Sequence, residues 1–429
     1  MVEVLVAMLW LAVGCAVPCA ALGTFLVVRR MSLLADAISH AVLPGIAVGF
    51  LLTRDLSSWA LVAGAAGFGV LTAVLSQWLH RRVRLPEDLS LGVVFTALFA
   101  LGVALITYAS RRWHVDLDPG CVLYGQLELS TVHVETVLGW KIPRAFVETL
   151  LPLNALVLVG IVLFWKELQL VSFDAEQAET LGYRPGWVNH GLLVAVAVVC
   201  VAVFREVGSI LVLALLIVPA ATALLLAKRL SSVVMIAVGI GVVGACLGCL
   251  FAARYNWNTA GSIALALGGL FALALLLSPR QGIIAQVVRR VALRWRIVGE
   301  DVLAFCYRIE EAAQKGRLSR GTIGNTDLRR LLGRFWPVVL WYLRLKGDLM
   351  PAGPGHWQLS ESGRTRARLI VRSHRLWETW LQRHFPLPPD HLHAIAERME
   401  HFLTPQLQAE LAAELGETHD PHGREIPPA

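Results

Sequence analysis

The sequence lacks several features that identify ATPases and secreted proteins. It contains neither GxxxxGKS nor GxxxxGKT, so the chain has no phosphate-binding loop and is not expected to hydrolyse ATP. Its seven cysteines suggest no disulfide framework, because most lie in apolar runs, where cysteine behaves as a small hydrophobic residue. The apolar stretch 2–28 has no basic leader and no clear small-residue cleavage site. It is therefore expected to be a first membrane span and not a removed signal peptide.

Apolar residues are in excess: hydrophobic types make up 56% of the chain, above the roughly 45–50% of soluble proteins. A membrane span needs about 20 mostly apolar residues. Residues 280–429 resemble a soluble protein instead. The predicted fold is an all-α polytopic membrane bundle of about nine transmembrane helices, followed by a polar C-terminal part. The candidate spans are about 3–28, 38–53, 57–79, 89–109, 145–165, 187–204, 207–227, 231–253 and 257–277.

Basic loops predict the orientation, because loops on the cytoplasmic side of a membrane carry an excess of Lys and Arg. A multi-pass protein of the cell (inner) membrane is expected, with an external N-terminus and a cytoplasmic C-terminal part. The segment 110–144 is an exception, since it is placed outside and holds four basic residues. The predicted inside loops carry Arg29 and Arg30, then Arg81, Arg82 and Arg84, then Lys166 and Arg184, then Lys228 and Arg229.

The stretch RRMSLLADAISHAVLPGIAVGFLL (29–52) places two ionisable residues at the start of a predicted span. Asp36 and His40 are four residues apart and share one helix face, with the hydroxyl of Ser39 nearby. Imidazole nitrogen and carboxylate oxygen together suit a divalent transition metal. The alternative is that Asp36 caps the helix and His40 is a hydrogen-bonded packing residue. The residues alone leave both interpretations open.

Within this stretch, MSLLADAISHAVLPGIAVG closely resembles a signature of the zinc/manganese/iron ABC permease family, the membrane subunits of high-affinity metal importers. Further segments resemble that family in the same order, and together they cover about residues 3–282. They are LPEDLSLGVVFTALFALGVAL (85–105), DLDPGCVLYGQLEL (116–129), FWKELQLVSFDAEQAETLGY (164–183), VGSILVLALLIVPAATALLLA (207–227) and NTAGSIALALGGLFALALLLSPRQG (258–282).

The resemblance implies a metal path along the seam between two permeases, either two copies or two paralogues. Asp36, His40 and Ser39 would contact the passing ion. Asp116 and Asp118, with Glu128, could form an outer acidic funnel, since like charges raise the local concentration of cations. They could equally belong to a solvated loop.

The resemblance also assigns the segment 172–184 to docking on a separate cytoplasmic ATPase, and it implies an extracytoplasmic metal-binding protein that delivers the ion. Phe173 would supply an apolar contact, and Asp174 and Glu176 polar contacts, in the stretch that ends at Gly182. The alternative is an ordinary amphipathic helix in a loop. ATP would act only through the partner subunit.

The C-terminal part carries a second group of candidate ligands. Glu400 and His401 follow His393 and Glu397 at spacings that place all four within one helical stripe, while a second helix offers His374 and Glu378. Two histidines and two carboxylates on one helix can hold a divalent ion. A solvated charged face is the alternative.

These segments resemble metal-dependent repressors of the diphtheria-toxin-repressor and manganese-regulator type. The expected organisation is a membrane domain (1–282), a basic linker (283–298), a degenerate winged helix (299–365) and a metal-binding and dimerisation domain (366–429). The six residues just named fall on ligand positions, and Asp301 falls on the first-helix ligand position. Glu397 stands where iron-type members have Cys, which favours manganese, or zinc, over iron. Ala304 replaces a frequent Glu, which could leave the site one ligand short.

DNA binding is disfavoured, because GRFWPVVLWYLRLKGD (333–348) lacks the polar side chains that read base edges. The sequence therefore predicts a permease subunit of an ATP-driven importer of manganese, zinc or iron, with a cytoplasmic metal-sensing domain. A membrane-tethered, metal-responsive transcription regulator and a secondary metal transporter are the alternatives. Basic segments of the C-terminal part, which contribute much of the net charge of +7, can also attract anionic lipid or nucleic acid.

Overall fold

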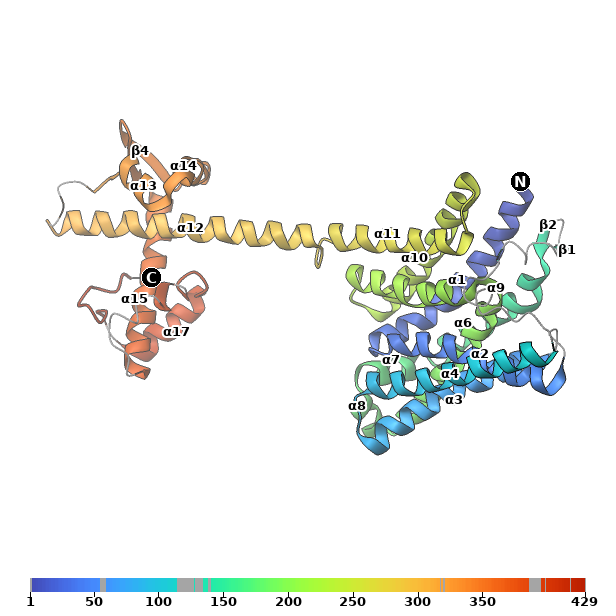
Figure 1. Ribbon diagram of the computed structural model, residues 1–429. Coiled ribbons are helices and arrows are strands. Elements are labelled where there is room, and N and C mark those ends of the chain that lie inside the picture. The colour runs from blue at the N-terminus through green and yellow to red at the C-terminus, as the bar shows by residue number, and fades with distance from the viewer. Residues whose placement is uncertain are drawn as a thin grey trace. The chain divides into compact units, whose positions relative to one another are not determined.

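The computed structural model describes residues 2–54, 59–113, 127, 134–137, 140–316, 318, 321–385, 395–397, 399–416 and 418–428. The chain forms two compact units, 1–286 and 287–429, called here the membrane unit and the C-terminal unit (Figure 1). Each unit has its own buried core, so each is described by itself.

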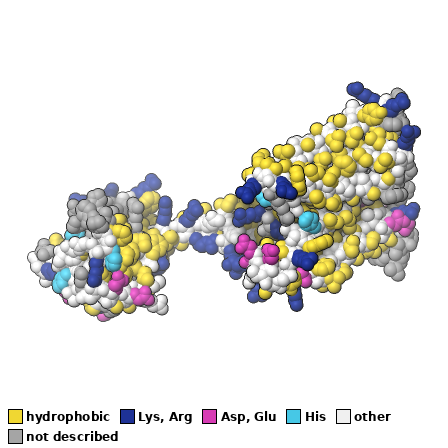
Figure 2. All heavy atoms as spheres, turned by 90° about the horizontal axis from the view of Figure 1, so that it is seen from below, with side chains coloured by type: hydrophobic (Ala, Val, Ile, Leu, Met, Phe, Trp, Pro, Cys, Tyr) yellow, Lys and Arg dark blue, Asp and Glu magenta, His cyan; other side chains and the backbone are white. Residues whose placement is uncertain are grey.

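The membrane unit is a bundle of apolar helices with one short hairpin. Because its helical stretches are apolar almost throughout, they can bury side chains against one another and still present an apolar surface (Figure 2). The elements are α1 (Val2–Val28), α2 (Ser32–Thr53), α3 (Trp59–Val83), α4 (Glu87–Trp113), β1 (Val134–Val137), β2 (Trp140–Pro143), η2 (Phe146–Leu150), α6 (Leu151–Leu163), α7 (Trp165–Phe173), α8 (Ala175–Thr180), α9 (Pro185–Leu226), α10 (Leu230–Tyr255) and α11 (Thr259–Leu277).

Among the described residues, eight helical stretches are long and apolar enough to cross a membrane. The predicted count of about nine differs by α3, which is a helix of 25 residues but is not among the eight. This helix packs very closely on α2: a Cβ atom on Gly45 would lie 2.4 Å from the carbonyl oxygen of Gly64. Small residues at such crossings let membrane helices approach to backbone contact. The eight stretches are Glu3–Val28, Asp36–Thr53, Leu89–Arg112, Phe146–Leu163, Pro185–Phe204, Glu206–Leu226, Leu230–Tyr255 and Thr259–Leu277.

Helix α9 contains two of these stretches, and the chain reverses between them. Gly208 has φ 77° and ψ 168°, a conformation that only glycine adopts readily. Successive residues of α9 interact first with the end of α1, then with its middle, and then with residues nearer its end again, as expected if α9 is a helical hairpin. In the order of α9, Asn189 accepts a hydrogen bond from Arg29, Glu206 interacts electrostatically with Cys15, and the backbone of Leu216 lies against Gly23.

The C-terminal unit combines a winged helix with a helical domain. Its elements are α12 (Ile283–Gln314), β3 (Ile323–Gly324), α13 (Asn325–Leu332), η3 (Gly333–Phe335), α14 (Trp336–Leu345), β4 (Leu349–Gly353), β5 (His356–Leu359), α15 (Glu361–His384) and α17 (Pro405–Leu415). Strands β4 and β5 pair to form the wing, and β5 also pairs with β3, which gives an antiparallel sheet of order β3-β5-β4.

Helix α12 is continuous through residue 298, where the sequence suggested that a linker ends and the winged helix begins. Its residues Val302 and Leu303 enter a core with Leu343 of α14 and Leu359 of β5. Helix α15 starts where the Ser360 hydroxyl accepts a hydrogen bond from the backbone N–H of Gly363. The fold class expected from the sequence, a helical membrane bundle followed by a small winged helix and a helical domain, is confirmed.

Candidate functional site

The two ionisable residues of α2 face each other. Asp36 Oδ1 lies 3.5 Å from His40 Nε2, and the two side chains are 39% and 25% exposed. The His40 ring packs on Phe95 and Phe99, with centroids 5.2 and 5.5 Å away. Its buried Nδ1 atom has no hydrogen-bond partner among the described residues. The pair therefore offers one imidazole nitrogen and one carboxylate, and both side chains are partly exposed to solvent.

The other predicted residues of the metal path lie outside what the structure describes. This applies to Asp116, Asp118 and Glu128, and also to the side chain of Ser39. A further acidic residue was missed by the sequence reasoning: Glu206, at the reversal of α9, is buried, and it is the only buried charged side chain among the described residues of the membrane unit. Its signal was a carboxylate between two apolar runs, where ionisable residues are functional candidates by default.

The segment predicted to dock on an ATPase forms the end of α7, the short α8 and the turn after it. Phe173 is exposed, whereas Asp174 caps α8 by accepting a hydrogen bond from Gln177 N at 2.8 Å. Glu176 is exposed, and Gly182 adopts φ 86° where α8 ends. The neighbouring surface is hollowed, and the depression is lined by Glu179, Gly182, Tyr183, Arg184, Pro185, Gly186, Trp187 and His190.

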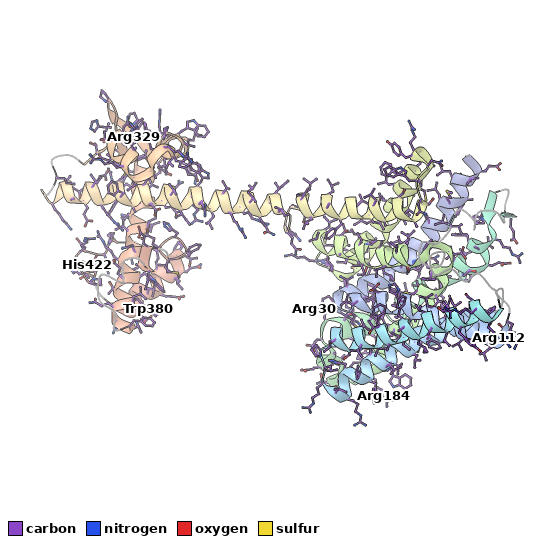
Figure 3. The ribbon with its side chains drawn as sticks, viewed as in Figure 1. Arg30, Arg112, Arg184, Arg329, Trp380 and His422 are labelled. Carbon is purple, nitrogen blue, oxygen red and sulfur yellow. The ribbon has the colours of Figure 1, made fainter. Side chains whose placement is uncertain are left out.

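This segment lies at one end of the membrane unit together with other predicted inside residues. Arg30 and Arg184 are at that end, and Arg112 is at the opposite end (Figure 3). Arg29 links three elements there, since it donates hydrogen bonds to Ser172 of α7, at 2.9 Å, and to Asn189 of α9. The two arginines that the sequence places inside therefore lie at one end, and Arg112, which it places outside, lies at the other.

The candidate ligands of the C-terminal unit come together from three segments. Asp301 lies on α12, His374 and Glu378 lie on α15, and Glu400 and His401 follow the helical residues 395–397 and 399. The Glu400 carboxylate lies between two histidines: its Oε2 is 2.5 Å from His374 Nδ1, and its Oε1 is 3.8 Å from His401 Nε2. One carboxylate is therefore shared between the His374 side and the His401 side of the cluster.

Each histidine has a further acidic partner. Nε2 of His374 lies 3.1 Å from Oε1 of Glu378, and Nε2 of His401 lies 3.1 Å from Oδ1 of Asp301. His374, Glu378 and Glu400 are buried, so the solvated charged face that the sequence left open is excluded for them. One ligand atom each from Asp301, Glu400 and His401 lie within 4.8 Å of one another.

The protonation states follow from these contacts. Burial alone would lower the pKa of His401, but hydrogen bonds to Asp301 and Glu300 outweigh it and raise the pKa to about 9. Burial likewise opposes protonation of His374, and its contacts with Glu378 and Glu400 raise its pKa above the usual value. The His401 imidazole therefore carries positive charge at neutral pH, and both histidines lie where the surrounding carboxylates favour a cation.

Glu300 is a functional candidate that the sequence reasoning missed. Its Oε2 lies 2.8 Å from Nδ1 of His401, while its Oε1 accepts a hydrogen bond from Arg296 at 2.7 Å. Burial would raise the pKa of Glu300, but the hydrogen bonds from His401 and Arg296 hold it below its usual range. A carboxylate behind a ligand histidine fixes the ring and leaves its other nitrogen for a metal.

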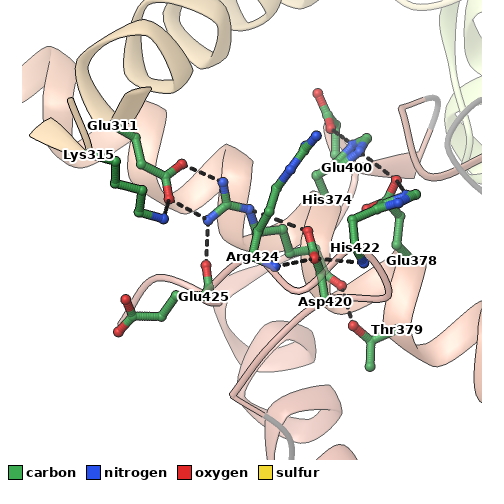
Figure 4. A network of polar contacts seen from close by, with 11 residues as sticks. Glu311, Lys315, His374, Glu378, Thr379, Glu400, Asp420, His422, Arg424 and Glu425 are labelled. Atoms are coloured by element: carbon green, nitrogen blue, oxygen red, sulfur yellow. Dashed lines mark hydrogen bonds and ion pairs between the residues drawn. The ribbon is translucent and has the colours of Figure 1, made fainter. Parts of the chain in front are cut away.

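His422 is a second missed residue. Its Nε2 lies 4.0 Å from Oε1 of Glu378 (Figure 4). Asp420 holds the turn that carries it, by accepting hydrogen bonds from the backbone N–H groups of His422 at 2.9 Å and Arg424 at 2.7 Å. The stretch DPHGRE was visible in the sequence, but its closeness to Glu378 arises only from the tertiary fold.

Three positions that the sequence considered contribute no described ligand to the cluster. Glu397 is exposed and is absent from the described cluster, and His393 lies outside the described residues. Ala304 is buried in a small apolar cluster with Ile370 and Val371. Two described separations fit a divalent transition metal: His401 Nε2 lies 3.1 Å from Asp301 Oδ1 and 3.8 Å from Glu400 Oε1. Oxygen and imidazole ligands about 2.0–2.2 Å from an ion lie within about 4.4 Å of one another.

Comparisons with known proteins agree with this division. The sequence model of the ABC 3 transport family matches residues 1–278. The chain belongs to that family. A second model, described as the iron dependent repressor metal binding and dimerisation domain, matches residues 360–428. The resemblances inferred from the sequence are therefore confirmed for both parts.

Similar proteins of this family are transport proteins. The zinc transport system membrane protein TroD of Treponema pallidum is 37% identical over 66% of this chain and 77% of its own length. The manganese transport system membrane protein MntD of Bacillus subtilis is 38% identical over 65% of this chain and 93% of its own. The solved structure of PsaBC from Streptococcus pneumoniae in complex with Fab is 30% identical, with TM-score 0.54, over 64% of this chain and 92% of that one.

Membership of the ABC 3 transport family makes this chain a multi-pass membrane permease subunit and not an enzyme. ATP hydrolysis then belongs to a separate ATPase subunit, in agreement with the missing phosphate-binding loop. A substrate-binding protein is the other partner that the family implies.

Proposed function

We propose that this chain imports a divalent transition metal, manganese or zinc, with energy from its partner ATPase, and that its C-terminal unit senses the same class of ion in the cytoplasm. The observation that carries the import is the Asp36–His40 pair inside a span of an ABC 3 family chain. The names of the relatives TroD and MntD support zinc and manganese as cargo.

The α2 pair is suited to brief contact with a passing ion. A partly exposed carboxylate and an imidazole replace only two water molecules of a hydrated divalent cation. The remaining ligands would be water or the Asp36–His40 pair of a second permease across the seam. An incomplete site of this kind holds an ion weakly, and weak binding suits a transporter, which must also release its cargo.

The end of the membrane unit that carries α8 is the cytoplasmic end in this proposal. Exposed Phe173 and the adjoining depression would receive the ATPase. The hydroxyl of Ser278, at the end of α11, donates a hydrogen bond of 2.7 Å to the carbonyl oxygen of Leu225 at the end of α9. Because α9 returns to the Arg29 end after its reversal, the chain leaves the membrane unit on that same side. The C-terminal unit would therefore be cytoplasmic.

The C-terminal site would be regulatory. Asp301, Glu400 and His401 would hold one ion, and His374, Glu378 and His422 surround a second position on the other side of Glu400. A bound ion supplies positive charge that ties these segments together. The residues of this chain do the rest: Glu300 orients the His401 ring, and Asp420 fixes the turn of His422. Metal bound here would report a full cytoplasmic pool and reduce import.

Transport is tested by reconstituting the chain with its ATPase and binding protein and measuring ATP-dependent uptake of radioactive manganese and zinc. Asp36→Asn and His40→Gln should each abolish most uptake, while His80→Gln, which changes an exposed histidine at the end of α3, should not. Normal uptake by both α2 variants would remove the pair from the path.

Sensing is tested on the full chain by titration calorimetry with manganese and zinc. Glu400→Gln should remove the tight binding, whereas the exposed Glu397→Gln should leave most of it. An Asp36→Asn background separates any weaker binding in the membrane unit. Unchanged binding in Glu400→Gln would refute the assignment of the C-terminal site and leave the transport proposal intact.

A further inference from the structure

The helix that takes the recognition position of the winged helix presents an apolar face to the outside. Val338, Trp341 and Leu345 of α14 repeat at intervals of three and four residues, so they share one face. Trp341 is 63% exposed and Leu345 is 67% exposed. The opposite side of the same helix, with Leu343, already fills the core of the unit. The exposed apolar face is therefore additional to the core, and no described part of the unit buries it.

Phe335, exposed just before α14, extends this face toward α13, where Leu331 is also exposed. These five residues, Leu331, Phe335, Val338, Trp341 and Leu345, are called here the α14 face. Monomeric soluble proteins rarely expose contiguous apolar surfaces of this kind, and such surfaces mark contacts with proteins or membranes.

Charge around the α14 face has one sign. Between residues 328 and 347 there are five basic residues and no acidic residue, and all five basic side chains are exposed. They are Arg329, Arg330, Arg334, Arg344 and Lys346. Arg329 lies in this part of the unit in Figure 3. Both acids that flank this stretch are engaged elsewhere: Asp327 accepts a hydrogen bond from the backbone N–H of Gly324 at 3.2 Å, and buried Asp348 pairs with Arg366. The partner of this face must therefore be anionic as well as apolar.

Duplex DNA fits the charge but not the chemistry of the face. Reading bases requires donors and acceptors aimed into the major groove. Val338 and Leu345 offer none, and Trp341 offers a single indole N–H. A second copy of this chain fits the apolar side chains but would bring five further positive charges against the same surface.

An anionic lipid surface satisfies both requirements. Trp, Phe and Leu side chains insert at the boundary between headgroups and acyl chains, while Arg and Lys pair with lipid phosphates. This chain also carries its own membrane unit, so the C-terminal unit is covalently tethered to a bilayer, and tethering raises the effective concentration of such a surface. We infer that the α14 face docks on the anionic phospholipid surface of the membrane that holds the chain.

The inference goes beyond metal transport and sensing, but it adds a connection to them. Tyr342 and Lys346 of α14 line a cavity of about 280 Å³ that also touches Glu300, Glu400 and His401. One helix therefore separates the metal ligands from the lipid-facing side chains. Docking would hold the sensor at the surface where its permease and ATPase work.

The test uses the full chain in lipid nanodiscs and follows hydrogen exchange in the peptide 334–346. Discs of phosphatidylcholine alone are compared with discs that also contain phosphatidylglycerol. In the anionic discs, exchange is expected to slow by about tenfold relative to detergent, the slowing produced by a face docked for about nine-tenths of the time. Neutral discs should protect the peptide less, because the basic residues contribute only with anionic lipid.

Two variants separate the two kinds of contact. Trp341→Ser with Leu345→Ser should abolish the protection in both kinds of disc. Arg329→Gln with Arg330→Gln and Arg334→Gln should abolish only the preference for anionic lipid. Leu407→Ser, an exposed apolar position on α17, is the matched control and should keep the protection.

Equal exchange in neutral discs, anionic discs and detergent would overturn the inference. Protection by duplex DNA in detergent, without any protection by lipid, would overturn it in favour of a nucleic-acid surface. Protection that depends on two chains sharing one disc, regardless of lipid charge, would overturn it in favour of pairing between copies. None of these outcomes alters the transport assay, so failure here is distinguishable from failure of the proposed function.

Discussion

The contact between α1 and the returning half of α9 makes a sharp prediction at Gly23. A Cβ atom added there would lie 1.9 Å from the carbonyl oxygen of Leu216 and 2.7 Å from its carbonyl carbon. An ordinary carbon–oxygen contact is about 3.3 Å, so the two backbones would have to separate by about 1.4 Å. The obstacle is main chain, and it cannot rotate away as a side chain can. Gly23→Ala must therefore displace one helix against the other.

The expected size follows from two opposing terms. Overpacking a tight interior usually destabilises by about 1–3 kcal/mol. Replacing glycine by alanine within a helix stabilises by up to about 1 kcal/mol. Because the displaced element is a whole helix, the first term should be near its upper end. The net loss for Gly23→Ala is then about 2 kcal/mol.

Gly239→Ala is the matched control, because it changes another helical glycine, in α10, whose added Cβ meets nothing within 4 Å. Thermal unfolding of both purified variants in the same detergent should place Gly23→Ala several degrees below the unsubstituted chain and Gly239→Ala level with it or above. Equal melting temperatures for the two variants would refute the close approach of α9 to α1, and with it the reversal at Gly208.

Three further predictions concern ATPase docking, metal binding and the pH dependence of stability. Phe173→Ala should reduce transport and the stimulation of the partner ATPase by the permease, measured as phosphate release, without changing the melting temperature; unchanged stimulation would remove this exposed residue from the docking surface. Glu300→Gln should weaken metal binding to the C-terminal unit by about 10–100-fold in calorimetry, because His401 loses the carboxylate that orients it, and an affinity equal to that of the unsubstituted chain would show that the contact is incidental. Burial would raise the pKa of Glu311, but hydrogen bonds from Arg375 and a nearby lysine hold it below its usual range. The ionised Glu311 carboxylate therefore stabilises the folded state fully above the unfolded-state pKa of about 4.3. This stabilisation is lost as pH falls through the lowered pKa of the folded state. The free energy of unfolding, measured with denaturant between neutral and acidic pH, should therefore fall less in Glu311→Gln than in the unsubstituted chain. An identical pH dependence in the two proteins would contradict that role.

Much of this arrangement could be predicted from local pattern. The apolar runs predicted the membrane helices, and the two spans on either side of Gly208 were separable in the sequence. His374 and Glu378 were paired by their spacing on one helix, and the structure brings their side chains within 3.1 Å. Periodicity is a local signal, and these features depend on little else.

The remainder depends on contacts between distant segments. Nothing near Glu300 in the sequence shows that it reaches His401, because the two residues are joined only when the segment after α15 returns to α12. Similarly, the reversal of α9 is visible only from its partners on α1, since the helix runs from Pro185 to Leu226 with one residue out of helical conformation. Spacing predicts which residues share a face and cannot predict which faces meet.

The shared carboxylate of Glu400 has a consequence for how sharply the C-terminal unit can respond. Its two oxygens face two histidines from different segments, so a positive charge that arrives on one side changes what the carboxylate offers the other. Two binding events joined through one side chain are not independent, and their coupling is reciprocal. Two cations that share one carboxylate repel each other, so the second would bind more weakly than the first. A unit built in this way would respond over a wider range of ion concentrations than a single site, which would let import decline gradually as the cell fills.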